Sequence, residues 1–327
     1  MTGRRNAARV ETGDWMPRVT LPTASGDIFD SWDFTAAGQI RVYWLGEPPA
    51  DTEAMLEPGL AACEASLLAV CRAPVARQHV RCLIDPRGEF EAAFGAGPSA
   101  AIVVDWADRV AAILSPATPV VVLAVVTRLH QASRPEVITG RAPVLMLERV
   151  VAPDLCRDLV AYWQRSEKRA NRVGSLTGNV VNADVKRRLD VQVDEPGLLA
   201  RLRADIGKRV VPAILRAFQI GIMVIEAPIV GCYDADEGGR FGRHRDNTSS
   251  HTAHRQFALS INLNPDDEYQ GGEVMFPEFG RELYRPTAGG ALVFSTSLLH
   301  EVTRVRKGRR FGVFTFLSAT APQTRRG

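Results

Sequence analysis

The segment Arg240-Phe241-Gly242-Arg243-His244-Arg245-Asp246 decides the fold and chemistry expected of the second half of this 327-residue chain. Side chains two positions apart on a β-strand point to the same face, so His244 and Asp246 can meet one ion together. His300 follows the apolar segment Ala291–Ser295, and a sheet folded on itself would bring it alongside. Two imidazoles and one carboxylate leave open coordination positions, as expected for non-haem Fe(II) that activates dioxygen. These donors also suit Mn(II), and only the coordination geometry would decide against zinc.

Arg310 ends the basic segment 304–310 (RVRKGRR), ten residues after His300. Alternation along a strand would send Arg309 outward and Arg310 inward. A buried guanidinium needs an anion, and its fork suits a carboxylate at the far end of a dicarboxylic acid that chelates the metal. The alternative is that Arg310 is one more solvated member of the basic segment.

The elements expected around these residues are two helices followed by many short strands. Periodic apolar residues predict helices over 155–169 and 197–218. Short strands separated by Gly, Pro, Asn and Asp predict a sandwich or barrel. These strands are expected over 223–233, 256–263, 272–276, Ala291–Ser295 and 310–317.

Further motifs occur in the same order and spacing as in a known family. They are Tyr233, Gly238-Gly239, Phe241, His244-x-Asp246, Leu259-x-Ile261-Asn262-Leu263, Gly271-Gly272-Glu273, Phe276-Pro277, Gly289-Gly290-Ala291, Val293-Phe294 and His300-x4-Val305-x2-Gly308-x-Arg310. With them, residues 144–327 resemble the 2-oxoglutarate-dependent Fe(II) oxygenases, specifically the prolyl-4-hydroxylase-like branch. The resemblance implies a double-stranded β-helix (jelly-roll) domain with flanking helices.

The resemblance also implies roles for individual residues. His244, Asp246 and His300 would be the metal ligands and the catalytic set. Arg310, where many relatives have Lys, would pair with the distal carboxylate of 2-oxoglutarate, and Tyr233 is a second candidate for that group. Asn262 is a candidate for supporting the cofactor, with a hydrogen bond at the strand end as its alternative.

The activity implied by the resemblance is a 2-oxoglutarate- and Fe(II)-dependent dioxygenase that forms succinate and CO2, with L-ascorbate as the candidate reductant. It would hydroxylate an aliphatic C–H of a peptide, a protein side chain or a small molecule, and Asp246 favours hydroxylation over halogenation. Nucleic-acid demethylases carry an RxNxTxR pattern that this chain lacks, so nucleic acid ranks low as a partner. The alternative from another class is a non-catalytic oxygen- or 2-oxoglutarate-sensing or partner-binding module.

The first half alternates strands and helices, which predicts an α/β domain. Strands are expected over 40–45, 79–84 and 100–105, and helices over 52–71, Glu89–Phe94 and 118–130. The motifs Thr12-Gly13-Asp14-Trp15-Met16-Pro17, Tyr43-Trp44-Leu45-Gly46, Leu83-Ile84-Asp85-Pro86 and Phe94-Gly95 make residues 12–130 resemble a peroxiredoxin on a thioredoxin-like fold.

The peroxidatic position departs from that family. Pro48-x3-Thr52 is followed by Met55 where the family has cysteine, and a thioether cannot form the thiolate that peroxide chemistry needs. We therefore expect a domain without peroxidase activity that positions the oxygenase or binds a partner. A peroxidase would require Cys63 or Cys71 to be exposed.

The domain organisation follows from composition. Segment 133–143, with its prolines and glycine, is the predicted linker between a domain over 1–132 and one over 144–327. Five cysteines without a CxxC pair, no visible signal peptide and a net charge of +3 predict a cytoplasmic protein with reduced thiols. Pro116 and Pro119 interrupt the one long uncharged segment, so no membrane partner is expected.

Two polar segments each have two possible roles. Arg255, which follows the polar loop 247–254, is a candidate contact for substrate or 2-oxoglutarate, and a surface role is the alternative. Lys186-Arg187-Arg188 is expected to be a solvated face, with a lip for an acidic substrate as the alternative. No feature of the sequence sets the oligomeric state or names the substrate.

Overall fold

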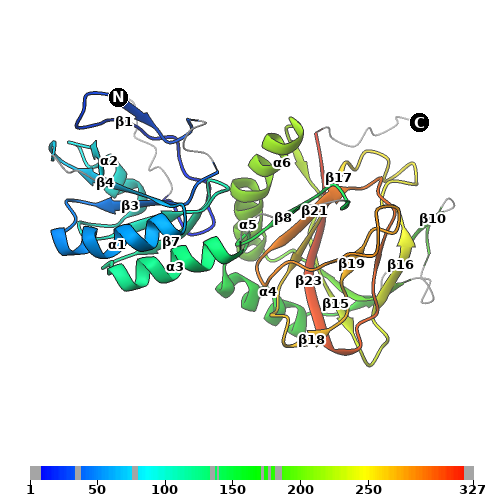
Figure 1. Ribbon diagram of the computed structural model, residues 1–327. Helices are drawn as coiled ribbons and strands as arrows, with labels where there is room; N and C mark the ends of the chain where they lie inside the picture. Colours follow the sequence, from blue (N-terminus) through cyan, green and yellow to red (C-terminus); the bar gives the residue numbers. More distant parts are fainter. Residues whose placement is uncertain are drawn as a thin grey trace. The chain divides into compact units, whose positions relative to one another are not determined.

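The computed structural model describes residues 9–33, 38–75, 80–132, 137, 140–170, 173–175, 178–180 and 186–319. The chain divides into two compact units, Met1–Val137 and Ile138–Gly327 (Figure 1). The division falls inside segment 133–143, most of which lies outside the described residues, so its role as a linker stays a prediction. No helix in the described ranges combines the length and the apolar character needed to cross a membrane.

A five-stranded mixed sheet organises the first unit, with strand order β5-β4-β3-β6-β7. The first three strands of that order are parallel, and β6 and β7 are antiparallel to their neighbours. The elements are β1 (Thr20–Pro22), β2 (Ile28–Asp30), β3 (Arg41–Leu45), α1 (Ala50–Ala62), β4 (Ser66–Cys71), β5 (Arg81–Ile84), α2 (Glu89–Phe94), β6 (Ala101–Val104), β7 (Val110–Leu114) and α3 (Pro119–Ala132).

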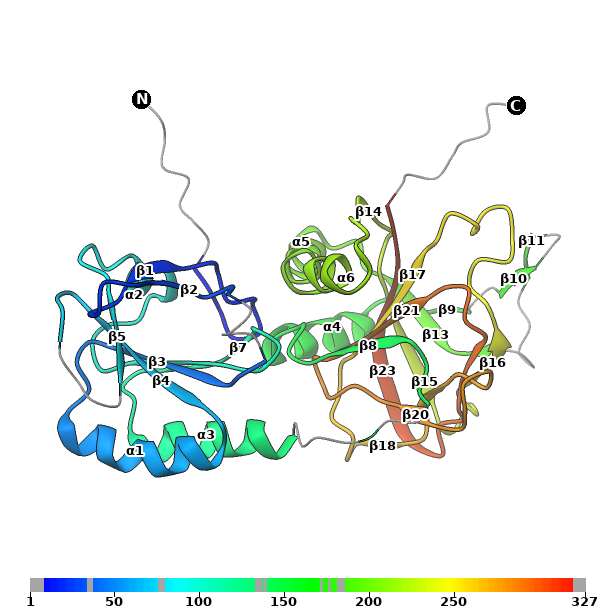
Figure 2. The same cartoon turned by 45° about the horizontal axis from the view of Figure 1, so that its top comes forward.

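Both faces of this sheet are covered. Val42 and Trp44 of β3 face α1 and α3, which lie along one face of the sheet (Figure 2). Tyr43 and Leu45 face the other side, where they pack with the β1–β2 hairpin and α2. This burial on both sides explains why β3 is apolar along nearly its whole length.

The structure corrects the helix expected over 52–71. The helix α1 ends at Ala62, Glu64 takes a positive φ of 51°, and Ser66–Cys71 forms strand β4. A short apolar segment such as SLLAVC suits a buried strand and a buried helix equally well. Here it forms a strand because it pairs with β3 along one edge and with β5 along the other. The strand β7 was also not predicted.

Among its described residues, the second unit contains two large antiparallel sheets and a separate two-stranded hairpin. The larger has nine strands among the described residues, in the order β8-β21-β17-β23-β15-β13-β9 with β14 and β18 added to β23. The smaller has the order β12-β16-β22-β19-β20. The strands of the larger sheet are β8 (Val144–Leu147), β9 (Arg169–Ala170), β13 (Leu189–Gln192), β14 (Val224–Ile225), β15 (Ile229–Asp234), β17 (Phe257–Asn262), β18 (Tyr269–Gln270), β21 (Ala291–Ser295) and β23 (Lys307–Ser318). Those of the smaller sheet are β12 (Lys186–Arg187), β16 (Arg240–His244), β19 (Val274–Met275), β20 (Leu283–Tyr284) and β22 (His300–Val302), and β10 (Val173–Ser175) pairs with β11 (Gly178–Val180) alone.

Helices cover the outer face of the larger sheet. They are α4 (Pro153–Arg165), α5 (Pro196–Asp205), the π-helical turn η1 (Ile206–Val210) and α6 (Val211–Phe218). The helix expected over 155–169 thus ends at Arg165, and the one expected over 197–218 contains a π-helical turn. The strand expected over 223–233 is interrupted between β14 and β15.

Alternation along the strands separates two cores. Val313 and Leu317 of β23 belong to the core beneath the helices, whereas Phe314 and Phe316 face the smaller sheet. Two facing antiparallel sheets with helices outside fit the jelly-roll expectation. The interior between the sheets is where the candidate site lies.

Candidate metal centre

His244 and His300 lie directly opposite each other on neighbouring strands. They are register partners at the ends of β16 and β22, and their ring centroids are 4.1 Å apart. Asp246 lies just beyond the end of β16, where its backbone N–H donates to the carbonyl of Thr296 over 3.0 Å. Its carboxylate oxygens are 3.4 Å from Nε2 of His244 and 3.5 Å from Nε2 of His300. One ligand atom from each side chain therefore lies within 4.8 Å of the others, close enough for one ion.

Backbone carbonyls orient both imidazoles. Nδ1 of His244 donates to the carbonyl of Gly242 over 2.8 Å, and Nδ1 of His300 donates to that of Leu298 over 3.0 Å. Because a carbonyl only accepts, each Nδ1 carries the proton and each Nε2 keeps its lone pair. Both lone pairs face Asp246, so the rings are oriented as metal ligands before any ion binds.

The surroundings also set the charge of these groups. Burial lowers the pKa of His300 to about 4, against the opposing effect of the Asp246 charge. Burial works to raise the pKa of Asp246, but the neighbouring His244 and His300 side chains, together with the charge of Arg255, outweigh it and hold that pKa below its usual value. At neutral pH the cluster therefore offers a neutral ring at His300 and an ionised carboxylate, which are the forms that bind metal.

Aromatic side chains enclose the two imidazoles. Phe241 stacks on His244 with 3.5 Å between centroids and 16° between planes. Phe294 contacts the ring of His300 edge-on at 4.7 Å. These contacts restrict both rings and keep the cluster in an apolar setting, which strengthens its electrostatic interactions.

Arg310 is buried in the same interior, as the alternation predicted. Its side chain donates from Nη1 to the carbonyl of Gly272 over 2.7 Å and from Nη2 to Oγ of Ser260 over 3.3 Å. Its Nε has no partner, and no carboxylate among the described residues forms an ion pair with it. Arg309, by contrast, is exposed and pairs with Asp234 at 2.6 Å. A buried guanidinium without a counter-ion fits a site for an anionic ligand.

Tyr233 is the register partner of Arg310 on the neighbouring strand β15. It is fully buried, and its hydroxyl accepts a hydrogen bond from Nη1 of Arg188 over 3.2 Å. Arg188 is itself buried and forms a two-pronged ion pair with Asp190, at 2.6 and 2.8 Å. The expectation that 186–188 is a solvated face is therefore wrong for Arg188, because strand alternation turns it inward together with Asp190.

Asn262 has its side-chain amide engaged by the protein. Nδ2 donates to the carbonyls of Asn264 and Pro286, at 2.9 and 3.3 Å, and Oδ1 accepts from the Tyr269 hydroxyl at 3.1 Å. These contacts correspond to the strand-end alternative, and none joins Asn262 to the guanidinium of Arg310.

Arg255 is held by Glu226, a residue that the sequence did not single out. Glu226 accepts from Nε and Nη2 of Arg255, at 2.8 and 2.7 Å, and from Nε2 of His254 at 3.0 Å. The guanidinium of Arg255 also covers the ring of Phe316 at 3.7 Å. A lone acidic residue inside an otherwise apolar segment was the available signal for Glu226.

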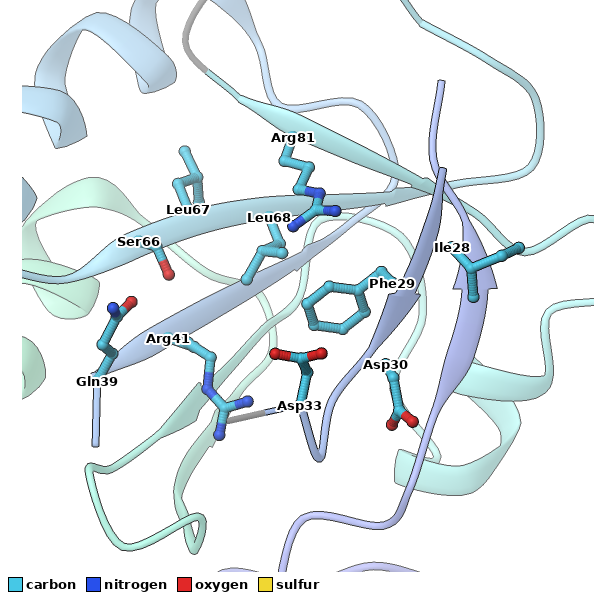
Figure 3. Close-up of a pocket in the computed structure, with 10 residues that line it drawn as sticks. All are labelled: Ile28, Phe29, Asp30, Asp33, Gln39, Arg41, Ser66, Leu67, Leu68 and Arg81. Atoms are coloured by element: carbon cyan, nitrogen blue, oxygen red, sulfur yellow. The ribbon is translucent and has the colours of Figure 1, made fainter. Parts of the chain in front are cut away.

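The three cysteines of the first unit are all buried. Met55 is exposed on α1, whereas Cys63 and Cys71 are buried. A pocket of about 230 Å³ opens elsewhere in the unit (Figure 3). It is lined by the starts of β3, β4 and β5 and by the β1–β2 hairpin, whereas α1 follows the end of β3, so the pocket is remote from Met55.

Comparisons with known proteins agree with this geometry. Residues 229–318 match the model of the 2OG-Fe(II) oxygenase superfamily. A PKHD-type hydroxylase of Paracoccus denitrificans is 31% identical over 178 residues, which is 50% of this chain and 75% of that protein. One of Saccharophagus degradans is 27% identical over 158 residues, 45% of this chain and 66% of that protein. The chain therefore spans between 66% and 75% of these relatives.

Solved structures give a looser likeness. A Pseudomonas putida prolyl-4-hydroxylase has a TM-score of 0.44 and 19% identity, over 55% of this chain and 94% of that one. A Trichoplax adhaerens prolyl hydroxylase, solved with a peptide of hypoxia inducible factor, has a TM-score of 0.45 and 16% identity, over 54% and 83%.

The facing sheets and the His-Asp-His cluster define a jelly-roll metalloenzyme, and the chain belongs to the 2OG-Fe(II) oxygenase superfamily. It is thus an oxidoreductase, a 2-oxoglutarate-dependent hydroxylase whose cofactors are Fe(2+) and 2-oxoglutarate.

Proposed function

We propose that His244, Asp246 and His300 hold Fe(II) and that Arg310 binds the distal carboxylate of 2-oxoglutarate. The observation that carries this proposal is the buried guanidinium of Arg310, which has no counter-ion among the described residues and lies in the same interior as the three ligand side chains. A dianionic keto acid that reaches the metal at one end and Arg310 at the other would satisfy both groups.

Each residue contributes before the reaction begins. Bound Fe(II) supplies the activation of dioxygen, with decarboxylation of 2-oxoglutarate to succinate and CO2. His244 and His300 present preoriented lone pairs, and Phe241 and Phe294 keep water from the rings. Gly272 and Ser260 fix the direction of the Arg310 guanidinium.

Tyr233 and Asn262 take supporting roles in this proposal. Tyr233 is the register partner of Arg310, and its hydroxyl accepts a hydrogen bond from Arg188. This hydroxyl is therefore a candidate for a second hydrogen bond to the distal carboxylate. Asn262 would act through Tyr269, holding the end of β17 in place. L-Ascorbate is the proposed reductant that keeps the iron in its Fe(II) state.

The substrate would offer an aliphatic C–H bond for hydroxylation. A peptide, a protein side chain and a small molecule remain the proposed classes, and Arg255 is a candidate contact because Glu226 and Phe316 fix its guanidinium.

For the first unit we propose a thioredoxin-like domain over 1–132, followed by a linker over 133–143, without peroxidase activity. The mixed sheet, with α1 and α3 on one face and α2 on the other, supports the fold. Met55 in place of a cysteine, and the burial of Cys63 and Cys71, support the loss of activity. All five thiols are free and buried, which supports the predicted cytoplasmic location.

The function is tested by succinate formation. Purified full-length protein with Fe(II), ascorbate and 2-oxoglutarate should form succinate slowly even without substrate, and His244→Ala should abolish it. If no metal-dependent succinate appears, the protein is instead the non-catalytic sensing or partner-binding module.

A further inference from the structure

Lys186 lies one aromatic ring away from a proposed metal ligand. It is the register partner of Phe241 across β12 and β16, and its Nζ lies over the Phe241 ring at 4.6 Å from the centroid. His244 stacks on the same Phe241 ring, with 3.5 Å between the ring centroids. The ammonium group, the phenyl ring and the imidazole therefore lie close together at the candidate metal centre.

Lys186 begins a segment, running from β12 into β13, in which the following alternate residues are buried. Lys186, Arg188 and Asp190 follow each other at every second position, and Arg188 and Asp190 are buried. Arg187, between them, is exposed. Lys186 is partly buried, and that burial, with the charge of Arg188, lowers the pKa of its ammonium group to about 7.

The other cations near the cluster are already balanced by acidic side chains. Arg188 is paired with Asp190, and Arg255 with Glu226. Within the described ranges, no acidic side chain forms an ion pair with Lys186. Burial without a counter-ion favours loss of the Lys186 proton, and a bound anion would instead hold Lys186 in its charged form.

A count of charges shows which side-chain charge the metal and the cofactor would leave unbalanced. Fe(II) with two neutral imidazoles and the Asp246 carboxylate carries one positive charge, and Arg310 carries another. The two carboxylates of 2-oxoglutarate would balance both. The protonated form of Lys186, which lies over the Phe241 ring, would then carry a charge that the cofactor does not balance.

We propose that the substrate carries a carboxylate and that this group pairs with Lys186 while the reacting C–H bond faces the metal. The proposal rests on the function proposed above and adds a substrate class to it. It places Lys186 as a specificity-determining residue, with Arg188 and Arg255 held in place by their own partners.

Acetate is a suitable probe of this site. Full-length protein would be loaded anaerobically with Fe(II) and 2-oxoglutarate, and acetate or acetamide added. Paramagnetic broadening of the methyl proton signal reports binding close to the iron. We expect acetate to be broadened and acetamide not, and Lys186→Gln to weaken acetate binding about tenfold, as loss of a charge-assisted contact predicts. Arg187→Gln, a neighbouring exposed cation, should leave acetate binding unchanged.

Acetate binding, 2-oxoglutarate binding and Fe(II) binding distinguish a failure of the substrate inference from a failure of the proposed function. Equal acetate binding by wild type and Lys186→Gln, or none by wild type, would overturn the substrate inference. Loss of 2-oxoglutarate binding in Lys186→Gln would assign Lys186 to the cofactor and also overturn it. If wild type fails to bind Fe(II) and 2-oxoglutarate at all, the proposed function itself has failed.

Discussion

His244 and His300 are cross-strand partners, and this pairing brings together two side chains that are far apart in sequence. Because β16 ends at His244, Asp246 belongs to the turn that follows and not to the strand. The turn is anchored by the hydrogen bond from the Asp246 backbone to Thr296, which places the carboxylate between the two Nε2 atoms. The cluster thus depends on one strand pair and one backbone contact.

Replacing a proposed ligand should weaken metal binding before it affects the fold. We expect His300→Ala to lower Fe(II) affinity about 100-fold or more, because one of three protein ligands is lost. Competition with a chelator measures this. His251→Ala, an exposed histidine in the loop 247–254, is the matched control and should bind iron as wild type does. Equal affinities of the two variants would contradict the ligand assignment.

Arg310 and Arg309 form a matched pair for testing the 2-oxoglutarate site. We expect Arg310→Gln to raise the KM for 2-oxoglutarate about 100-fold, since an anion would lose its buried partner. Arg309→Gln removes only an exposed contact with Asp234 and should change KM little. Succinate formation at varied 2-oxoglutarate gives both values. A small change in both variants would place the distal carboxylate elsewhere.

Gly272 offers an indirect test of the same guanidinium. Its φ is +78°, and a Cβ there would lie 2.9 Å from Cδ of Arg310. Gly272→Ala should therefore displace Arg310 and weaken 2-oxoglutarate binding, while iron binding is kept. Gly221→Ala, where no atom lies within 4 Å of the added Cβ, is the control. Titration calorimetry of the iron-loaded proteins would show whether the two variants differ, and indistinguishable affinities would refute the prediction.

The thiols of the second unit should be unreactive in the folded protein. Burial raises the pKa of Cys156 and of Cys232 to about 12. Since the thiolate is the reactive form, alkylation should be very slow at pH 8 and should accelerate only as pH approaches that value or the chain unfolds. Mass spectrometry after iodoacetamide treatment measures this, and rapid labelling of the native protein at pH 8 would speak against it.

The first unit should not consume peroxide. Cys63 and Cys71 are buried, and Met55 cannot form a thiolate. We expect the full-length protein with a dithiol reductant to remove hydrogen peroxide no faster than its Cys63→Ser variant. A fast activity that this substitution abolishes would restore the peroxidase hypothesis.

Local spacing predicted the centre of the site but not its surroundings. Arg310 could be found from the strand alternation, and His244 and Asp246 from their spacing, although Asp246 lies in the turn after β16 and not on the strand itself. The pairing of Glu226 with Arg255 could not be predicted, because the two residues are distant in sequence and meet only in the folded sheet. The inward direction of Arg188 was visible in the alternation with Asp190, yet a run of three cations also suits a solvated surface.

The fold of the second half was predictable as a sandwich or barrel, because turn residues separate its strands. The strand β4 was not, because SLLAVC carries no period that separates a buried strand from a helix. Its pairing with β3 and β5 is what makes this segment a strand, and that pairing is a property of the whole sheet.

The central claim is that one Fe(II) and one 2-oxoglutarate bind together in the interior between the sheets. Anaerobic titration of the iron-loaded protein with 2-oxoglutarate tests it most directly, with bound iron and bound 2-oxoglutarate both quantified after desalting. The account predicts one of each per chain in wild type, iron without 2-oxoglutarate in Arg310→Gln, and loss of both in His244→Ala. Equal retention of iron and 2-oxoglutarate by all three proteins would contradict it.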